Sequence, residues 1–309
     1  MKKILVYTQG GHADKTAWVN HLVHPVRAYW GDGTSEWLKH KKDFVFFTKY
    51  FELTDNVKDC EVAFLPLTLN YYFKNNKSHL LKNFIKVVSK NKKKTFIWVD
   101  GDHQNRFNDL DCIFLKYSGY KSKLNGNEFI LPGDVKQDLL GSFLNGKLIL
   151  KEKGKKPRIG FDGIANYNSL KLIALIGKNF LYNINYKIFK YPFEGDPVIP
   201  YFLKRKHILN MLESSSEIEK NFSIRDTFAV GTVGKDNKSR NEYINNILSS
   251  DYTLCYRGAS NYSLRFYETL CLGRIPLFIN TDCKLPFENN INWKEVCLWI
   301  EESELYQIS

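Results

Sequence analysis

Two consecutive α/β domains of the doubly wound kind are the fold that this sequence predicts. Short runs rich in Val, Ile and Phe alternate with segments of helical periodicity along the chain. A basic, polar stretch at Lys151–Lys156 interrupts that alternation, and the chain of 309 residues suits two domains of about 150 residues each. Buried strands separated by helices pair in parallel through right-handed crossovers. We therefore expect one domain over residues 1–150 and a second over residues 151–309.

In the first half, five runs have the apolar character of strands, and one segment has the spacing of an amphipathic helix. The expected strands are Lys3–Thr8, Asp43–Tyr50, Val62–Leu69, Thr95–Asp100 and Asp111–Tyr117. The expected helix is Ser78–Ser89, followed by a lysine run that suits the negative end of a helix dipole.

In the second half, the alternation begins again after Pro157. Strands are expected at Arg158–Asp162, Tyr186–Tyr191, Tyr252–Tyr256 and Ile275–Asn280. Helices are expected at Ser169–Leu181, His207–Glu219, Ser239–Leu248 and Ser263–Leu272. Doubly wound domains bind ligands at the carboxyl ends of their strands, so a pair of them is expected to hold a ligand in a shared cleft.

Composition excludes several classes of protein. The 43% hydrophobic and 15% aromatic content exceeds that of a disordered chain, and nine Pro and 19 Gly are too few for a collagen-like or low-complexity one. The longest uncharged apolar stretch, Val62–Phe73, is shorter than the roughly 20 residues that a membrane-spanning helix needs. Six cysteines without a CxxC pair or metal-finger spacing favour a reducing, cytoplasmic compartment.

The charge balance points to anionic partners. Lys and Arg number 45 against 33 Asp and Glu, a formal net charge of +12. Such a balance suits phosphate-bearing ligands or the surface of an anionic membrane, and peripheral membrane contact is one hypothesis that it supports. No familiar nucleic-acid-binding motif occurs, so no nucleic-acid partner is expected.

The most informative segment is Tyr252–Asn280. Its expected strand ends at Tyr256, a polar turn follows, and a helix begins near Ser263, whose hydroxyl can cap the first free amides. A helix start at the carboxyl end of a strand offers N–H donors and a partial positive charge, which suit a diphosphate. Arg257 and Arg265 add permanently charged donors for phosphate oxygens.

Glu268 follows Arg265 by three residues, so both side chains project from the same face of the expected helix. A carboxylate at that place can accept hydrogen bonds from the two hydroxyls of a ribose. The alternative is that the two residues only pair with each other on an exposed helix. Their spacing alone leaves both interpretations open.

Over residues 239–293 the sequence resembles the exostosin family, inverting glycosyltransferases of the two-domain GT-B architecture. The residues that match the family pattern are Cys255, Arg257, Gly258, Ser263, Arg265, Tyr267, Glu268, Thr269, Leu270, Gly273, Ile275, Pro276, Asp282, Leu285, Pro286, Phe287, Ile291 and Trp293. The resemblance implies two Rossmann-like domains facing a central cleft. It also implies that the donor-binding residues are Arg257, Gly258, Ser263, Arg265 and Glu268.

The resemblance further implies a function. An exostosin-like enzyme moves a sugar from a nucleotide-diphosphate sugar, which we expect to be UDP-linked, to a glycan or lipid-linked glycan in polysaccharide or glycoconjugate synthesis. The C-terminal domain would bind the donor and the N-terminal domain the acceptor, without a cofactor or metal ion. The N-terminal half resembles the family only loosely, and the whole chain is similar to a compact bacterial or viral version of it.

A loop in the first half supplies the candidate catalytic base. Inverting transfer needs a group that takes the proton of the acceptor hydroxyl, and the loop after the strand Thr95–Asp100 offers Asp102 first, then Asp100 and His103. The loops at Gln9–Asp14 and Trp30–Gly33 compete for this role.

Two rival functions remain at this point. Asp100–Gly101–Asp102 is also a DxD pattern, which in the other glycosyltransferase architecture holds a divalent cation at the nucleotide diphosphate. A metal-dependent transferase is therefore one alternative to the metal-independent enzyme that we favour. The other is a non-catalytic protein that binds a nucleotide or sugar on the same fold.

Overall fold

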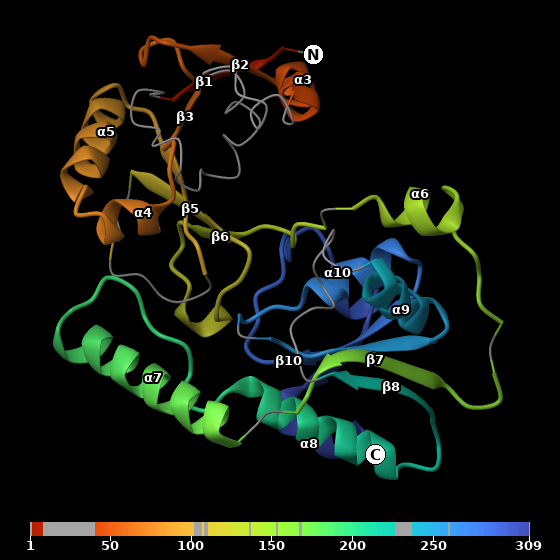
Figure 1. Ribbon diagram of the computed structural model, residues 1–309. Helices are drawn as coiled ribbons and strands as arrows, with labels where there is room; N and C mark the ends of the chain where they lie inside the picture. The colour runs from red at the N-terminus through yellow and green to blue at the C-terminus, as the bar shows by residue number, and fades with distance from the viewer. Residues whose placement is uncertain are drawn as a thin grey trace. The chain divides into compact units, whose positions relative to one another are not determined.

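The chain forms two compact α/β units, each built on a parallel sheet (Figure 1). The computed structural model describes residues 2–8, 41–101, 107, 111–135, 137–152, 154–166, 169–225, 237–258 and 260–308. Unit 1 comprises residues 1–116 and 124–130, and unit 2 comprises residues 117–123 and 131–309. The predicted fold class is confirmed, and two such units are consistent with the two Rossmann-like domains of the GT-B architecture.

Unit 1 contains a six-stranded sheet in the order β2-β1-β3-β4-β5-β6, in which every neighbouring pair is parallel. Its strands are β1 (Ile4–Tyr7), β2 (Phe51–Thr54), β3 (Val62–Phe64), β4 (Thr95–Trp98), β5 (Cys112–Lys116) and β6 (Glu128–Ile130). Its described helices are α3 (Lys41–Tyr50), α4 (Leu69–Lys74) and α5 (Ser78–Lys90). As its spacing predicts, α5 buries one apolar face, formed by Leu81, Phe84, Ile85 and Val88.

Unit 2 contains a five-stranded parallel sheet in the order β11-β10-β9-β7-β8. Its strands are β7 (Arg158–Ile164), β8 (Glu219–Arg225), β9 (Tyr252–Cys255), β10 (Ile275–Asn280) and β11 (Leu298–Glu301). Its described helices are α6 (Leu139–Leu144), α7 (Ser169–Ile188), α8 (Tyr201–Ser214), α9 (Asn237–Leu248) and α10 (Leu264–Cys271). Across the described residues of both units, no helix is both long enough and apolar enough to cross a membrane.

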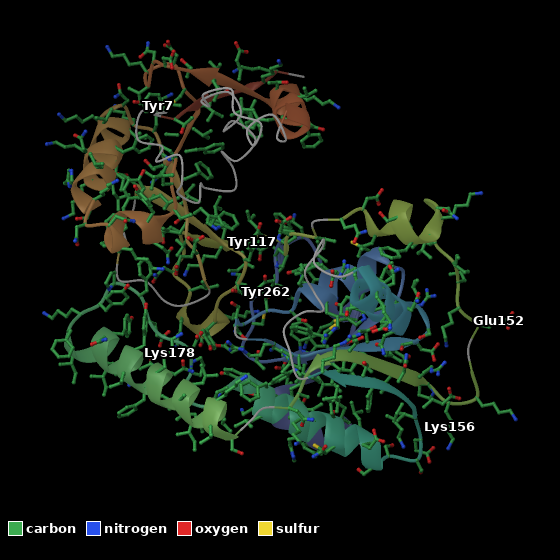
Figure 2. The ribbon with its side chains drawn as sticks, viewed as in Figure 1. Tyr7, Tyr117, Glu152, Lys156, Lys178 and Tyr262 are labelled. Carbon is green, nitrogen blue, oxygen red and sulfur yellow. The ribbon has the colours of Figure 1, made fainter. Side chains whose placement is uncertain are left out.

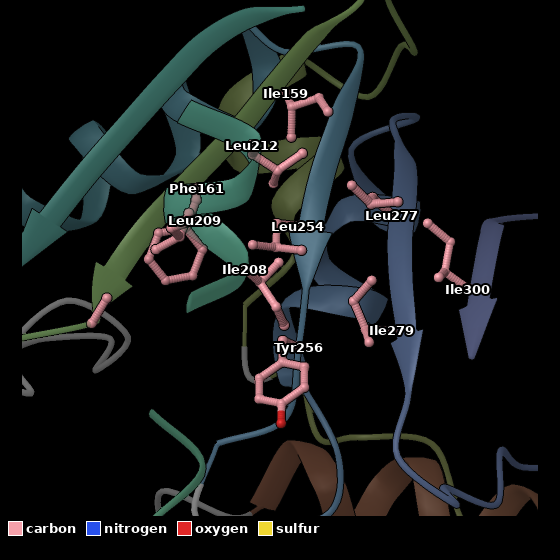
Figure 3. Packing of buried hydrophobic residues seen from close by; sticks show 11 residues of the cluster. Ile159, Phe161, Ile208, Leu209, Leu212, Leu254, Tyr256, Leu277, Ile279 and Ile300 are labelled. Carbon is pink, nitrogen blue, oxygen red and sulfur yellow. The ribbon is translucent and has the colours of Figure 1, made fainter. Parts of the chain in front are cut away.

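Helices cover both faces of the sheet of unit 2. On one face, Ile208, Leu209 and Leu212 of α8 pack against apolar side chains of β7, β9 and β10 (Figure 3). On the other face, Phe266 of α10 belongs to a separate cluster with Cys255 of β9. Successive strand residues point to opposite faces, which is why neighbouring positions of β9 contribute to different clusters.

The chain passes from unit 1 to unit 2 near residue 130, earlier than the boundary at residue 150 that the basic stretch suggests. The residues between these points belong to unit 2 because α6 packs there. Leu139 and Leu144 of α6 form a buried cluster with Tyr243, Ile244 and neighbouring residues of α9. The basic stretch Lys151–Lys156 leads from α6 into β7.

Two expected strands are helical, and those two predictions are wrong. Asp43–Tyr50 lies in α3, and the strand β2 follows it. Tyr186–Tyr191 begins inside the last turn of α7, which continues beyond the expected end at Leu181. A short apolar run does not by itself distinguish a buried strand from a helix, and here the helical period prevails.

The expected helix His207–Glu219 is displaced. The helix α8 begins six residues earlier, at Tyr201, and ends at Ser214, and Glu219 is the first residue of β8. This strand lies at the edge of the sheet, where half-exposed polar residues replace the apolar run by which inner strands are recognised.

Candidate functional site

The predicted donor-binding residues gather at the carboxyl ends of β7 and β9 in unit 2. The turn after β9 is closed by a hydrogen bond from the Gly258 amide to the Tyr262 carbonyl, 3.4 Å long. Ser263 then occupies the N-cap position of α10, as expected. Its hydroxyl makes no capping bond, so the prediction of a side-chain cap is wrong. This end of a parallel sheet is where doubly wound domains bind their ligands.

Arg265 of α10 contacts the backbone of two strands, β7 and β9. Its Nη2 donates to the Asp162 carbonyl of β7 at 2.5 Å and its Nη1 to the Leu254 carbonyl of β9 at 3.3 Å. The guanidinium lies over the ring of Phe161, 4.5 Å from the ring centre. These contacts hold the guanidinium in place, and all of the groups that make them are neutral.

Arg205 of α8 meets the same region from the other side of the sheet. Its Nη1 donates to the Ile164 carbonyl at 2.8 Å and its Nη2 to the Arg257 carbonyl at 2.5 Å. Burial, together with the nearby positive charge of Arg265, lowers the pKa of Arg205 to about 10. A lowered pKa means that the surroundings disfavour its charge, and a bound anion would reverse that effect.

Arg257 is 2% exposed and lies against two aromatic rings. Its Nη1 donates to the Tyr120 hydroxyl at 2.7 Å, and its guanidinium lies 3.7 Å from the ring centre of Tyr201. Burial raises the pKa of Tyr120 well above its usual value, although Arg257 acts in the opposite direction. Tyr120 is therefore a neutral hydroxyl at physiological pH. In the same segment, Tyr117 stacks with Tyr262 of the turn (Figure 2).

Glu268 is 4% exposed, and both of its carboxylate oxygens have partners. Tyr243 of α9 donates its hydroxyl to Oε2 at 2.6 Å, and Arg240 Nη2 lies 2.8 Å from Oε1. The alternative in which Glu268 pairs with Arg265 on an exposed helix is therefore wrong, because the carboxylate is buried and its ion pair is with Arg240. Each carboxylate oxygen can accept a further hydrogen bond.

A second ion pair lies beside the first. Asp162 is 2% exposed and accepts two hydrogen bonds from Arg225, at 2.5 Å from Nε and 2.7 Å from Nη2. Arg225 also contacts Glu242 of α9 at 3.0 Å. The bidentate geometry holds the carboxyl ends of β7 and β8 together.

Some buried donors of this group have no acceptor among the described residues. They are Arg205 Nε, Arg265 Nε and Arg240 Nη1. A buried donor that makes no hydrogen bond destabilises the structure by about 1–3 kcal/mol. Oxygen atoms of a bound anion would satisfy such donors, which makes this the strongest sign that the region receives a ligand.

Sequence reasoning missed several residues of this site. Arg205, Arg240 and Tyr243 were given no role, although the last two stand three residues apart on one helix. That spacing on α9 was an available signal, because it puts both side chains on one face. Arg205 had no such signal, since only the packing of α8 against the sheet brings it to the strand ends.

In unit 1, the structure describes Asp100 but not Asp102 or His103, which lie outside the described residues, as do the loops Gln9–Asp14 and Trp30–Gly33. Asp100 follows β4 at its carboxyl end. The side chain of Asn70 donates to the Asp100 carbonyl at 3.0 Å and accepts from the Asp100 amide at 2.8 Å. The buried amide of Asn70 thus fixes the backbone from which the predicted base loop starts. Among described residues, no group of three or more His, Cys, Asp or Glu side chains is arranged to hold a metal ion.

Fold and site together define an α/β protein with two parallel sheets and an arginine-rich site in its second unit. Residues 204–309 match the family model of the Exostosin GT47 domain. The chain is 36% identical over 76 residues to Exostosin-1 of Drosophila melanogaster, a match that covers 24% of this chain and 10% of that protein. The predicted resemblance to the exostosin family is thus confirmed over residues 204–309. That match spans about a tenth of the length of the curated relative.

Proposed function

We propose that this protein is an inverting glycosyltransferase that takes its sugar from a nucleotide-diphosphate donor, UDP-linked, bound in unit 2. The observation that supports this most directly is the pair of buried Nε donors on Arg205 and Arg265, which have no acceptor among the described residues. Both side chains belong to the segment that matches the Exostosin GT47 domain.

The arginines are suited to bind the diphosphate, which leaves with the electron pair of its bond to the sugar. Arg257 and Arg265 would bind its oxygens, and the Gly258 amide and the start of α10 at Ser263 would add N–H donors. Charge builds up on the diphosphate as the bond to the sugar breaks, so fixed guanidinium groups stabilise the transition state more than the bound donor. We add Arg205 to this group, because its Nε has no acceptor among the described residues and its pKa is lowered by burial and by the positive charge of Arg265, an effect that a bound anion would oppose.

Glu268 is proposed to hold the ribose of the donor. Its carboxylate is oriented by Tyr243 and Arg240, which leaves acceptor capacity on both oxygens. Arg257, Arg265 and Glu268 would contact the phosphates and the ribose of the donor. Other residues would therefore select its nucleobase.

The N-terminal part of the chain, residues 1–150, is proposed to bind a glycan or lipid-linked glycan acceptor. The acceptor hydroxyl attacks the anomeric carbon on the side opposite the diphosphate, its proton passes to the base, and the bond to the diphosphate breaks. Asp102 is proposed as that base, with Asp100 and His103 as the other candidates.

As part of the same proposal, we assign the protein to a reducing, cytoplasmic compartment. All six cysteines are described and all are free thiols, five of them buried. Proteins of oxidising compartments more often use cysteines in disulfides.

Turnover on a panel of donors and glycan acceptors tests this function. We expect release of UDP from one UDP-sugar, accelerated by one acceptor, and a product whose anomeric configuration, followed by NMR, is inverted. In Arg265→Gln, kcat/KM should fall by about a hundredfold, as when one preorganised donor to a developing charge is removed. Nucleotide binding without any turnover would support the non-catalytic alternative, and retention of configuration would contradict inversion.

A further inference from the structure

The outward face of α7 is an apolar stripe bordered by lysines. Leu170, Leu181 and Ile188 are 77%, 62% and 67% exposed. At 3.6 residues per turn these three positions lie on one side of the helix, and the exposed Ile173 and Phe180 lie next to them. We define these five residues as the α7 stripe.

The opposite side of α7 packs against its own unit. Asn179, its buried residue, donates to the Pro197 carbonyl at 2.9 Å. Asn183 donates to the Asp196 carbonyl at 2.7 Å, and Tyr182 packs edge-on against Tyr191. The helix is thus held by segment 191–197. By helical periodicity Asn179 lies opposite Leu170, Leu181 and Ile188, so the α7 stripe is on the side away from that segment.

The charges around the α7 stripe are all positive. Lys171 and Lys178 lie on one flank by helical periodicity, Lys187 lies on the other, and all three are exposed (Figure 2 labels Lys178). Lys190 follows just after the helix. Residues 163–193 contain no Asp or Glu, and Glu194, which comes next, is paired with Lys123 at 2.7 Å.

We propose that α7 lies in the surface of an anionic membrane, with its stripe among the lipid chains and its lysines at the headgroups. An apolar stripe flanked by basic side chains is what interfacial helices present to such a surface, since lysine stems extend along the apolar region while their ammonium groups reach the phosphates. A twofold contact between two copies would instead bring these lysines against one another. The partner is therefore a lipid surface with negative headgroups.

Vesicle binding of the full chain tests this proposal without any use of activity. The probes are vesicles of phosphatidylcholine alone and of phosphatidylcholine with phosphatidylglycerol, and the readout is co-sedimentation. We expect binding to the second kind only. Equal binding to both, or to neither, would overturn the proposal.

Two variants separate the stripe from the charge. In Leu181→Gln/Ile188→Gln, partitioning should weaken by about tenfold or more, because two exposed apolar side chains no longer enter the lipid. In Lys171→Glu/Lys178→Glu/Lys187→Glu, it should weaken by at least about a hundredfold, since each basic side chain near an anionic surface contributes about fivefold. Circular dichroism and thermal melting verify that these exposed substitutions leave the fold intact.

The helix α5 supplies a matched control. Its lysines Lys82, Lys86 and Lys90 are exposed like those of α7, but its apolar face is buried. The variant Lys82→Glu/Lys86→Glu/Lys90→Glu changes the net charge by the same amount and should retain most vesicle binding. If the α5 and α7 charge variants lose binding equally, net charge alone attracts the chain and the proposed role of α7 is wrong.

Hydrogen exchange and light scattering complete the test. On anionic vesicles, amides of residues 169–188 should exchange more slowly, while those of residues 78–90 should not change. If instead the chain is a dimer that Leu181→Gln/Ile188→Gln converts to a monomer, with vesicle binding unaffected, then the stripe is a protein interface and the membrane proposal fails.

Discussion

The guanidinium of Arg265 is positioned by backbone that lies far from it in the sequence. It donates to the carbonyls of Asp162 and Leu254, and it lies over Phe161. The neighbouring Gly163 leaves room for it, because a Cβ at that position would lie 2.9 Å from Arg265 Nη2. The proposed donor site therefore depends on the absence of a side chain at Gly163 of β7.

This close approach gives a first prediction. Gly163→Ala should displace the guanidinium of Arg265 and weaken UDP binding by about tenfold, the effect of one lost hydrogen bond to a charged group, with little change in melting temperature. Calorimetric titration measures the affinity. Gly177→Ala on α7 is the control, because its added Cβ would have no atom within 4 Å apart from its chain neighbours and the backbone of its own helix, and helix propensity should make that variant slightly more stable. Unchanged affinity in Gly163→Ala would remove Arg265 from the proposed site.

A second prediction separates the structural role of Glu268 from its proposed contact with ribose. Glu268→Gln should lower the free energy of unfolding by about 3–5 kcal/mol, because it leaves the buried charge of Arg240 without its partner. The double variant Arg240→Met/Glu268→Gln should recover much of that stability in urea unfolding. Its UDP affinity should stay low if Glu268 holds the ribose. Recovery of affinity together with stability would show that the carboxylate only supports the fold.

The residue scale also shows how far the sequence predicts the site. Arg257, Arg265 and Glu268 stand within twelve residues of each other, so one segment with a recognisable pattern contains them. Their partners Arg205, Arg240 and Tyr120 come from other elements and depend on how those elements pack. Local spacing predicted which side chains gather at the strand ends, but not that Glu268 is buried in an ion pair.

Among the elements, β7 and β9 begin side by side, and Asp251 joins their starts. Its Oδ2 accepts from the Arg158 amide at 2.7 Å, and its Oδ1 lies 2.5 Å from Lys151 Nζ. Burial acts to raise the pKa of Asp251, but the hydrogen bonds from Lys151 and Arg158 prevail and hold it below its usual value.

The lowered pKa of Asp251 predicts how the stability of the fold changes at acid pH. Asp251→Asn should lower the free energy of unfolding by about 1–2 kcal/mol at neutral pH, because the charge-assisted bonds are lost. A carboxyl group whose pKa is lower in the folded state than in the unfolded state stabilises the fold at pH values above the unfolded-state pKa. This stabilisation is lost as the pH falls through the folded-state pKa. The difference between wild type and variant should therefore shrink below about pH 4 in urea titrations. A difference that is constant with pH would show that the charge of Asp251 contributes nothing.

Element type could be predicted where burial follows a clear period. The buried face of α5 and the strands β4, β9 and β10 agree with their sequence patterns. The pattern misleads where an element is half exposed, as in α7, whose apolar residues face outward, and in the edge strand β8. Apolar periodicity in the sequence indicates that a helix or strand has an apolar face. It does not indicate whether other parts of the protein cover that face.

For the whole molecule, the proposed neutralisation of the diphosphate by arginines predicts how the proposed sugar transfer responds to chelators. If arginines neutralise the diphosphate, sugar transfer should keep most of its rate in excess EDTA. The measurement is the rate of UDP release with and without EDTA, followed by addition of Mn²⁺. Loss of activity in EDTA and its recovery with Mn²⁺ would favour the DxD alternative, in which Asp100 and Asp102 hold the cation.

The central claim is that guanidinium groups of unit 2 bind the diphosphate of the donor. Calorimetric titration of UDP, UMP and uridine tests it most directly, on wild type and on Arg265→Gln. We expect affinity to fall in that order for the wild type, to weaken with added salt for UDP, and to differ less between UDP and uridine in Arg265→Gln, in which Arg257 and Arg205 remain. Equal affinity of the wild type for UDP and uridine would contradict the account, as would a variant that distinguishes them as strongly as the wild type does.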